Sequence, residues 1–402
     1  MTLKEMKDKV REYMYIEDDS MIDIALACII ANRLKIGDPV WLMIIGASSS
    51  GKSQLLRPLA ITDTQFIHRV DDITENTFLS GSIGKGGKDV SLLTRIGQHG
   101  MIAISDLTIL FSRNAESRNA ILSQLRMIYD GEMTKFVGNK DKPIYWKGYL
   151  GVISGGTPSI YSAFEEVADM GERFLCFRMK KYDTILAANK ALNRKVYGKE
   201  LDQILSELYG EYIENIVKGV SEVPELSEKT RDFIITISDF AERIRAINKI
   251  DKFTKEIERI PTPAMPMRTA LQLSSLAKSL TIMRGRDLDD ADMKIIAWVG
   301  FSLANEEKRA VLTILAHHIN PISSQIVADE IGLDTKVTRS VLQNLASVGI
   351  IQRRGEGGSL KWIINEEYDQ IIKEITGIQK IKHIEDREVT DEEYQGDSSI
   401  PF

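Results

Sequence analysis

The chain has 402 residues and 43% of them are hydrophobic, which allows two or three domains with cores of their own. This excludes a small scaffold that depends on disulfides or a structural metal. Cys28 and Cys176 lie in apolar stretches and predict buried thiols in a reducing compartment, so we expect a cytoplasmic protein. The net charge of −6 falls on residues 385–402, which hold seven acids and one arginine, so it does not exclude DNA as a partner.

Residues 1–34 are expected to form N-terminal helices, and the second of them, 21–34, is mostly apolar and therefore buried. In residues 35–182 short apolar runs alternate with helical stretches, which predicts an α/β fold with a parallel sheet. The expected strands cover residues 41–45, 65–70, 101–104, 149–154 and 174–179. A nucleotide in such a fold binds at the carboxyl ends of the strands.

Residues 46–53 read Gly-Ala-Ser-Ser-Ser-Gly-Lys-Ser, a complete P-loop between the first strand and an apolar helix. Its glycines let the backbone N–H groups surround phosphates, while Lys52 and the Ser53 hydroxyl reach phosphate oxygens and Mg²⁺. We therefore predict that the chain binds ATP with Mg²⁺. The predicted binding residues are Gly46, Ser48, Ser49, Ser50, Gly51, Lys52 and Ser53, and Ser53 also contacts the metal.

Asp106 follows the apolar run 101–104 and is the acid that a P-loop NTPase needs at the end of an adjacent strand. Ser105 precedes it, so only one acid is present where two are usual. Asp106 takes either the metal position, with a base from elsewhere, or the water-activating position beside a serine that replaces the metal acid. A third reading makes Asp106 the N-cap of the next helix.

Three further residues suit phosphate chemistry. Thr157, with Ser154 as second choice, ends an apolar strand and could sense the γ-phosphate. Arg173 stands at the mouth of a strand, and Arg268 begins a helix. A lone arginine is more often a surface residue, and their order along the chain favours the phosphate role.

Residues 183–302 are expected to be a helical lid, broken only at the proline-rich segment 261–266. Residues 303–366 fit a winged helix, with helices at 306–317, 323–331 and 335–347 and a hairpin wing at 350–364. The expected DNA contacts there are Lys336, Arg339, Arg353, Arg354 and Lys361. A winged helix can also serve as a protein–protein module. Residues 367–402 are expected to form an amphipathic helix and a disordered acidic tail.

Residues 135–147 read as a β-hairpin around Gly138, with Lys140 and Lys142 near its tip. The segment 81–88 is a second basic, glycine-rich loop. Either loop could contact DNA in a pore, or be an ordinary surface hairpin and a mobile connector.

This series of motifs resembles the AAA+ ATPases and, among them, the minichromosome-maintenance-like (MCM-like) replicative helicases of phages and mobile elements. The matching segments are residues 46–53, 100–106, 153–158, 171–174 and 267–270, and the resemblance covers about residues 35–366. It implies a hexameric ring with DNA through its centre, Arg173 completing the neighbour's site, Arg268 as second sensor, and a pore hairpin that grips phosphates. Ser105 departs from the family's paired acids and puts the hydrolysis rate in question.

The last residues, Ile400, Pro401 and Phe402, follow an acidic run and resemble the tip of bacterial single-stranded-DNA-binding proteins. The resemblance implies that Phe402 docks in an apolar pocket of host replication proteins. The alternative is a chance ending.

The sequence thus predicts an ATP-dependent translocase or helicase that acts on single-stranded or forked DNA during replication of a phage or mobile element. The alternative is a non-motor AAA+ helicase loader or initiation switch. A winged-helix regulator with a vestigial ATPase is a third possibility. DNA-stimulated ATPase with strand displacement would separate them.

Overall fold

The computed structural model describes residues 1–48, 50–81, 91–136, 143–162, 173–180, 182–246, 249–250, 257–259, 262–355 and 360–377. The chain divides into two compact units, which we call unit 1 (Met1–Ile235 with Met267–Val299) and unit 2 (Thr236–Pro266 with Gly300–Phe402). In the described ranges no helix is long and apolar enough to cross a membrane.

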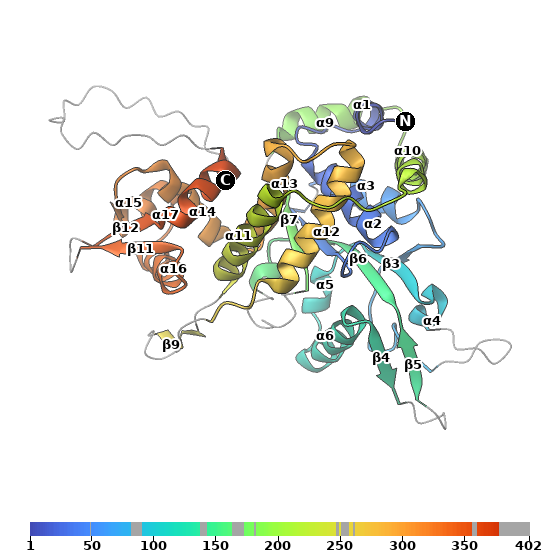
Figure 1. The fold of residues 1–402 in the computed structure, drawn as a ribbon, viewed down its shortest axis with the longest axis horizontal. Coiled ribbons are helices and arrows are strands. Elements are labelled where there is room, and N and C mark those ends of the chain that lie inside the picture. Colours follow the sequence, from blue (N-terminus) through green and yellow to red (C-terminus); the bar gives the residue numbers. More distant parts are fainter. Residues whose placement is uncertain are drawn as a thin grey trace. The chain divides into compact units, whose positions relative to one another are not determined.

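A five-stranded parallel sheet forms the centre of unit 1, in the order β2-β3-β6-β1-β7, and its strands lie among the helices of that unit (Figure 1). Every residue of β1 is buried, because a parallel strand covered on both faces can be apolar throughout. The predicted α/β fold with a parallel sheet is confirmed. The strands are β1 (Trp41–Ile45), β2 (Ile67–Val70), β3 (His99–Ile104), β6 (Tyr149–Gly156) and β7 (Leu175–Arg178).

Helices cover this sheet. The two predicted N-terminal helices are present as α1 (Leu3–Tyr13) and α2 (Ser20–Arg33). Helix α2 is apolar on nearly every side because it packs against β1, β3 and β6 and also against α12 (Met267–Arg284). Further helices in the described part of unit 1 are α3 (Lys52–Ala60), α4 (Leu92–Ile96), α5 (Thr108–Phe111), α6 (Ala115–Tyr129), α9 (Thr184–Asn193) and α10 (Gly198–Gly219).

The connections explain why helices lie on both faces. Helix α3 lies on the connection from β1 to β2, and α6 lies on the connection from β3 to β6, so the two connections cross the sheet in opposite directions. Since such crossovers are right-handed, α3 and α6 lie on opposite faces. Because all five strands are parallel, they end at the same edge of the sheet, which we call the carboxyl edge, and begin at the opposite amino edge.

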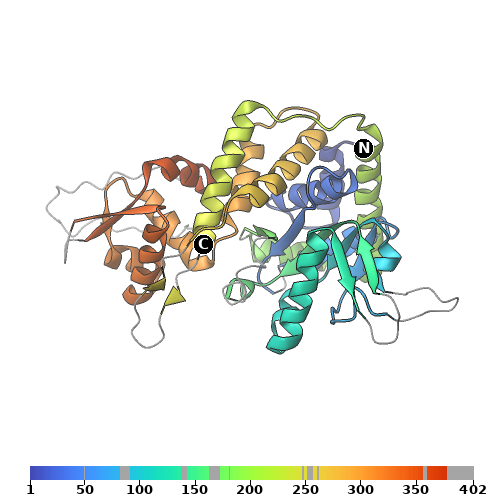
Figure 2. The ribbon, with the colours of Figure 1, turned by 60° about the horizontal axis from the view of Figure 1, so that its bottom comes forward.

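An antiparallel hairpin follows α6. Its strands, β4 (Glu132–Lys135) and β5 (Ile144–Lys147), confirm the predicted hairpin, and it projects from unit 1 in both views (Figures 1 and 2). Met133 and Trp146 are buried on one of its faces. The tip with Lys140 and Lys142 lies outside the described residues, as does most of the loop 81–88.

Unit 2 contains a three-stranded antiparallel sheet, β10-β12-β11, with helices before and after it. The three helices and the hairpin predicted for residues 303–366 are all present. The elements are α14 (Glu306–His317), β10 (Ile322–Ser323), α15 (Ser324–Ile331), α16 (Thr335–Ser347), β11 (Ile351–Arg354), β12 (Lys361–Ile364) and α17 (Glu366–Thr376).

Helices α11 (Glu228–Arg245) and α13 (Asp290–Phe301) cross the border between the units, which falls inside the segment 183–302. The expectation that this segment is helical except at its prolines is wrong at two short strands, β8 (Lys249–Ile250) and β9 (Ile257–Arg259). Ile250 pairs with Ile257 there, and β-branched side chains favour the extended backbone.

Candidate nucleotide site

The P-loop leaves β1 at Gly46, whose N–H donates to the carbonyl of Gly156 at the end of β6 (3.1 Å). A Cβ on Gly46 would lie 2.6 Å from Ser50 Oγ and 3.0 Å from Met179 Sδ, so both of those side chains would have to move. Gly51 has φ 83°, a left-handed conformation that favours glycine, and it is the N-cap of α3. Both glycines of the motif are therefore required by the fold of the loop. Ser49 lies outside the described residues.

Lys52 curls over the loop that precedes it. Its Nζ donates to the carbonyl oxygens of Gly46 (2.6 Å) and Ala47 (2.7 Å) and lies 3.3 Å from Ser50 Oγ. Burial lowers the pKa of Lys52, and the negative charge of Asp106 acts in the opposite direction. Asp106 is thus close enough for its charge to act on the ammonium group of Lys52.

Asp106 and Thr157 meet around Thr108 at this edge. Asp106 Oδ1 accepts from the N–H of Thr108 (2.8 Å), and Thr108 Oγ1 accepts from the N–H of Thr157 (2.9 Å). Asp106 therefore bonds to the first residue of α5, but the N-cap of that helix is Leu107, so the N-cap interpretation of Asp106 is wrong by one residue. The charge of Asp106 also acts on Lys52. Ser154, the second choice to Thr157, is completely buried inside β6 and lies away from the edge.

A second acid stands beside Ser105. Asp71, directly after β2, accepts a hydrogen bond from Ser105 Oγ at its Oδ1 (2.7 Å) and another from Arg69 Nε (3.0 Å). The bond from Ser105 lowers the pKa of Asp71. Sequence reasoning missed this residue, although its position after the predicted strand 65–70 was a signal. In the described part of the chain no group of three or more His, Cys, Asp or Glu side chains could hold a metal ion.

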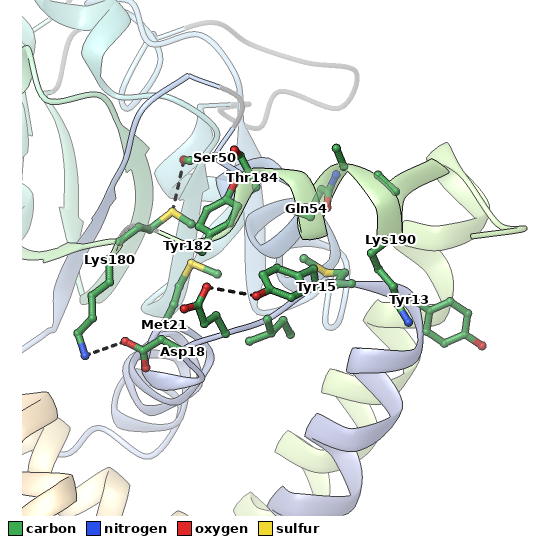
Figure 3. Close-up of a pocket in the computed structure, with 18 of the residues that line it drawn as sticks. Tyr13, Tyr15, Asp18, Met21, Ser50, Gln54, Lys180, Tyr182, Thr184 and Lys190 are labelled. Carbon is green, nitrogen blue, oxygen red and sulfur yellow. Dashed lines mark hydrogen bonds and ion pairs between the residues drawn. The ribbon is translucent and has the colours of Figure 1, made fainter. Parts of the chain in front are cut away.

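A cavity of about 310 Å³ opens beside the P-loop (Figure 3). Its walls come from the link between α1 and α2, the P-loop with the start of α3, the end of β7, and α9. Two tyrosines, Tyr15 and Tyr182, lie with their ring centroids 6.4 Å apart at an angle of 48°. Other lining residues are Tyr13, Met21, Ser50, Gln54, Met179 and Ala187.

Polar contacts fasten the walls of this cavity to each other. Lys180 Nζ forms an ion pair with Asp18 Oδ2 (2.8 Å), which joins the segment after β7 to the α1–α2 link (Figure 3). Glu17 accepts from the N–H of Asp183 (3.0 Å) just before α9. These contacts therefore hold the walls of the cavity together, and the walls are aromatic and apolar. No sequence motif marked the cavity, because its walls come from four separate segments.

Arg173 and Arg268 lie elsewhere, at the amino edge. Their guanidinium carbons lie 5.8 Å and 5.5 Å from the ring centroid of Tyr129, the last residue of α6. Tyr129 packs edge-on against Trp41, the first residue of β1. Five residues of strand, or about 16 Å, separate Trp41 from the P-loop at Gly46. The two arginines are thus close to each other and distant from the phosphate loop of their own chain.

The basic residues predicted to contact DNA from unit 2 are all exposed. Lys336 and Arg339 lie on α16, while Arg353 and Arg354 lie on β11, where Arg354 is opposite Lys361 of β12. The tail with Ile400, Pro401 and Phe402 lies outside the described residues.

No protein-family model matches the chain, and a search of curated proteins finds no match either. The fold and the site themselves are consistent with a P-loop α/β core, with the loop at the carboxyl end of a central strand.

Proposed function

We propose that this protein is an AAA+ ATPase that uses ATP to move along or unwind DNA, as its sequence resemblance implies. The observation that carries the proposal is the complete P-loop at the carboxyl end of β1, directly beside a cavity with aromatic walls. A cavity of about 310 Å³ is at the lower end of the range for small-molecule sites.

ATP would bind with its phosphates on the P-loop and its base in the cavity, since Ser50 and Gln54 belong both to the loop region and to the cavity wall. Tyr15 and Tyr182 offer aromatic faces to a base. Mg²⁺ takes few protein ligands beside phosphate oxygens and water, and Ser53 with Asp106 would supply them. Its chemistry there is to neutralise charge on the phosphates.

The position of the two arginines supports assembly of several copies of the chain. Arg173 and Arg268 lie against Tyr129, which packs on Trp41 at the start of β1, and about 16 Å of strand separates Trp41 from the P-loop. A second copy whose carboxyl edge faces this amino edge would bring its phosphates to them. Repetition of one such head-to-tail contact closes a ring where the rotation between neighbouring copies divides a full turn evenly.

The hairpin and unit 2 support contact with DNA. Phe136 and Tyr145 are 80% and 56% exposed at the described end of the hairpin stem, and exposed aromatic rings stack on bases of single strands. Tyr145 is opposite Thr134, two residues before Phe136, so both rings belong to one face of the hairpin. We interpret the helices and hairpin of unit 2 as a winged helix, with α16 and β11 carrying the exposed cations.

The test is ATP turnover measured with and without single-stranded DNA, together with displacement of a labelled strand from a fork. We expect DNA to raise turnover, and Phe136→Ala with Tyr145→Ala to remove that increase while basal turnover stays. Turnover that DNA leaves unchanged, with no displaced strand, would overturn the motor.

Ser105 favours a second candidate, a non-motor switch that loads another helicase or regulates assembly. A serine in place of an acid suits slow hydrolysis, in which ATP controls conformation. That function predicts tight ATP binding with turnover that DNA does not stimulate. The same assay therefore separates the two candidates.

A further inference from the structure

We propose that Tyr129 is a positioning residue that holds Arg173 and Arg268 together as one unit, and that Gln272 fastens this unit to the first residue of the P-loop strand. The inference rests on the proposed function, in which both arginines act on a nucleotide bound by a second copy of the chain. It adds two residues that no sequence motif indicated.

Tyr129 lies where the two arginines meet. It is only 6% exposed, and its ring lies under both guanidinium groups, at 5.8 Å from Arg173 and 5.5 Å from Arg268. Its hydroxyl has no hydrogen-bond partner among the described residues. The ring, and not the hydroxyl, therefore makes the contact. A cation above an aromatic face is attracted by the negative face of the ring.

Gln272 joins the same parts through the backbone. It follows Arg268 by four residues, one turn further along α12, and it is fully buried. Its Oε1 accepts from the N–H of Trp41 (3.1 Å), and its Nε2 donates to the carbonyl oxygen of Arg173 (3.2 Å). One carboxamide thus ties the helix of one arginine to the backbone of the other and to the start of β1.

The ring of Trp41 completes the connection. Its centroid lies 5.2 Å from that of Tyr129, at 83°, and 5.1 Å from that of Phe174, the residue after Arg173. The N–H of its indole donates to the carbonyl of Leu150 on β6 (2.7 Å). The arginines are therefore attached to β1, which ends in the P-loop of the same chain. A shift at either edge of the sheet would be transmitted along this strand.

Charged neighbours complete the surroundings of Tyr129. Asp130 forms an ion pair with Arg173 (3.3 Å), and the charge of Asp38 also acts on the Tyr129 phenol. Burial raises the pKa of Tyr129, so the ring stays neutral at physiological pH. A neutral ring supports the arginines without adding a negative charge to that of Asp130.

The test uses Tyr129→Leu, which keeps apolar volume but removes the aromatic face, and Tyr129→Phe, which keeps the face. We expect Tyr129→Phe to match the unaltered protein. We expect Tyr129→Leu to bind ATP with unchanged affinity and to lose about tenfold or more of its turnover. Gln272→Leu should behave like Tyr129→Leu, because it removes both of the bonds that place the pair.

Mixtures of subunits separate positioning from a general defect. Lys52→Ala subunits lack ATP but keep the arginines, so they should restore turnover to Tyr129→Leu subunits. Arg173→Ala subunits should not, because both partners would then lack a working arginine pair. The inference is overturned if Tyr129→Phe is as impaired as Tyr129→Leu, if Tyr129→Leu fails to bind ATP, or if Arg173→Ala subunits rescue it. If Lys52→Ala and Arg173→Ala subunits do not restore each other, the proposed shared site itself fails.

Discussion

The two edges of the central sheet carry different residues of the proposed ATP site. The carboxyl edge holds the P-loop together with Asp106 and Thr157, and the last two are joined by hydrogen bonds to Thr108. The amino edge holds Arg173 and Arg268 above the ring of Tyr129. In the proposed function the carboxyl edge binds the phosphates, whereas the arginines at the amino edge lie at the other end of the sheet from the P-loop.

This difference shows why residues that follow one another as motifs need not form one site within one chain. A parallel sheet has two ends, and a chain with a binding surface at one end and cations at the other can complete a site by association with a second copy. Substitutions at the two edges should therefore affect ATP binding and ATP turnover separately.

Arg173→Ala should have the largest effect on turnover. An arginine that acts from a neighbouring subunit stabilises the transition state, and its loss costs about 10³-fold or more in rate in other NTPases. ATP affinity should stay the same, because the residue lies at the other edge. ATP turnover assays measure the rate and nucleotide titration measures the affinity for ATP, with Arg286→Ala as the control. A large loss of ATP affinity would place Arg173 in its own chain's site.

Lys52→Ala should weaken ATP binding by about 100-fold, because it removes the charged hydrogen bonds of the P-loop to phosphate oxygens. Isothermal titration with a non-hydrolysable ATP analogue measures this, and Lys4→Ala, at an exposed position, is the control. Unchanged affinity would mean that the loop at the carboxyl edge is not the nucleotide site.

Tyr15→Ala should weaken ATP binding by about tenfold, since stacking of a base on an aromatic ring contributes roughly 1–3 kcal/mol. Inorganic triphosphate, which has no base, should bind as before. Tyr15→Phe, which keeps the ring, should bind ATP normally. If triphosphate and ATP lose affinity equally, the cavity beside the P-loop does not hold the base.

Asp71→Asn should have the smallest effect, a loss of about fivefold in turnover, because it weakens the hydrogen bond from Ser105, the residue before Asp106, to the end of β2. The neighbouring Asp72 forms an ion pair with Arg113, so Asp72→Asn is a matched control. Equal turnover for the two variants would show that the acid at the end of β2 plays no part at the carboxyl edge.

The features that depend on residues adjacent in the chain could be predicted from the sequence. The run of five apolar residues before the P-loop predicted β1. Gly46 lies where a Cβ would meet the side chains of Ser50 and Met179, and Gly51 has a positive φ. The five sheet strands were also predicted, with ends that differ by up to two residues, and the hairpin β4–β5 was predicted to begin three residues later than it does.

Contacts between distant segments could not be predicted. Asp71 meets Ser105 only because β2 and β3 pair side by side, and the pattern of each strand does not reveal its partner. Tyr129 and Gln272 look like ordinary helix residues until α6 and α12 are brought to the start of β1. The strand order and the cavity beside the P-loop likewise arise from packing across the whole unit.

The most direct test of the divided site is to mix two inactive proteins. Lys52→Ala subunits keep the amino edge and Arg173→Ala subunits keep the carboxyl edge, so an equal mixture should recover ATP turnover, up to about a quarter of the unaltered rate if subunits assemble at random and sites act independently. Turnover in the mixture no higher than in either protein alone would contradict the account.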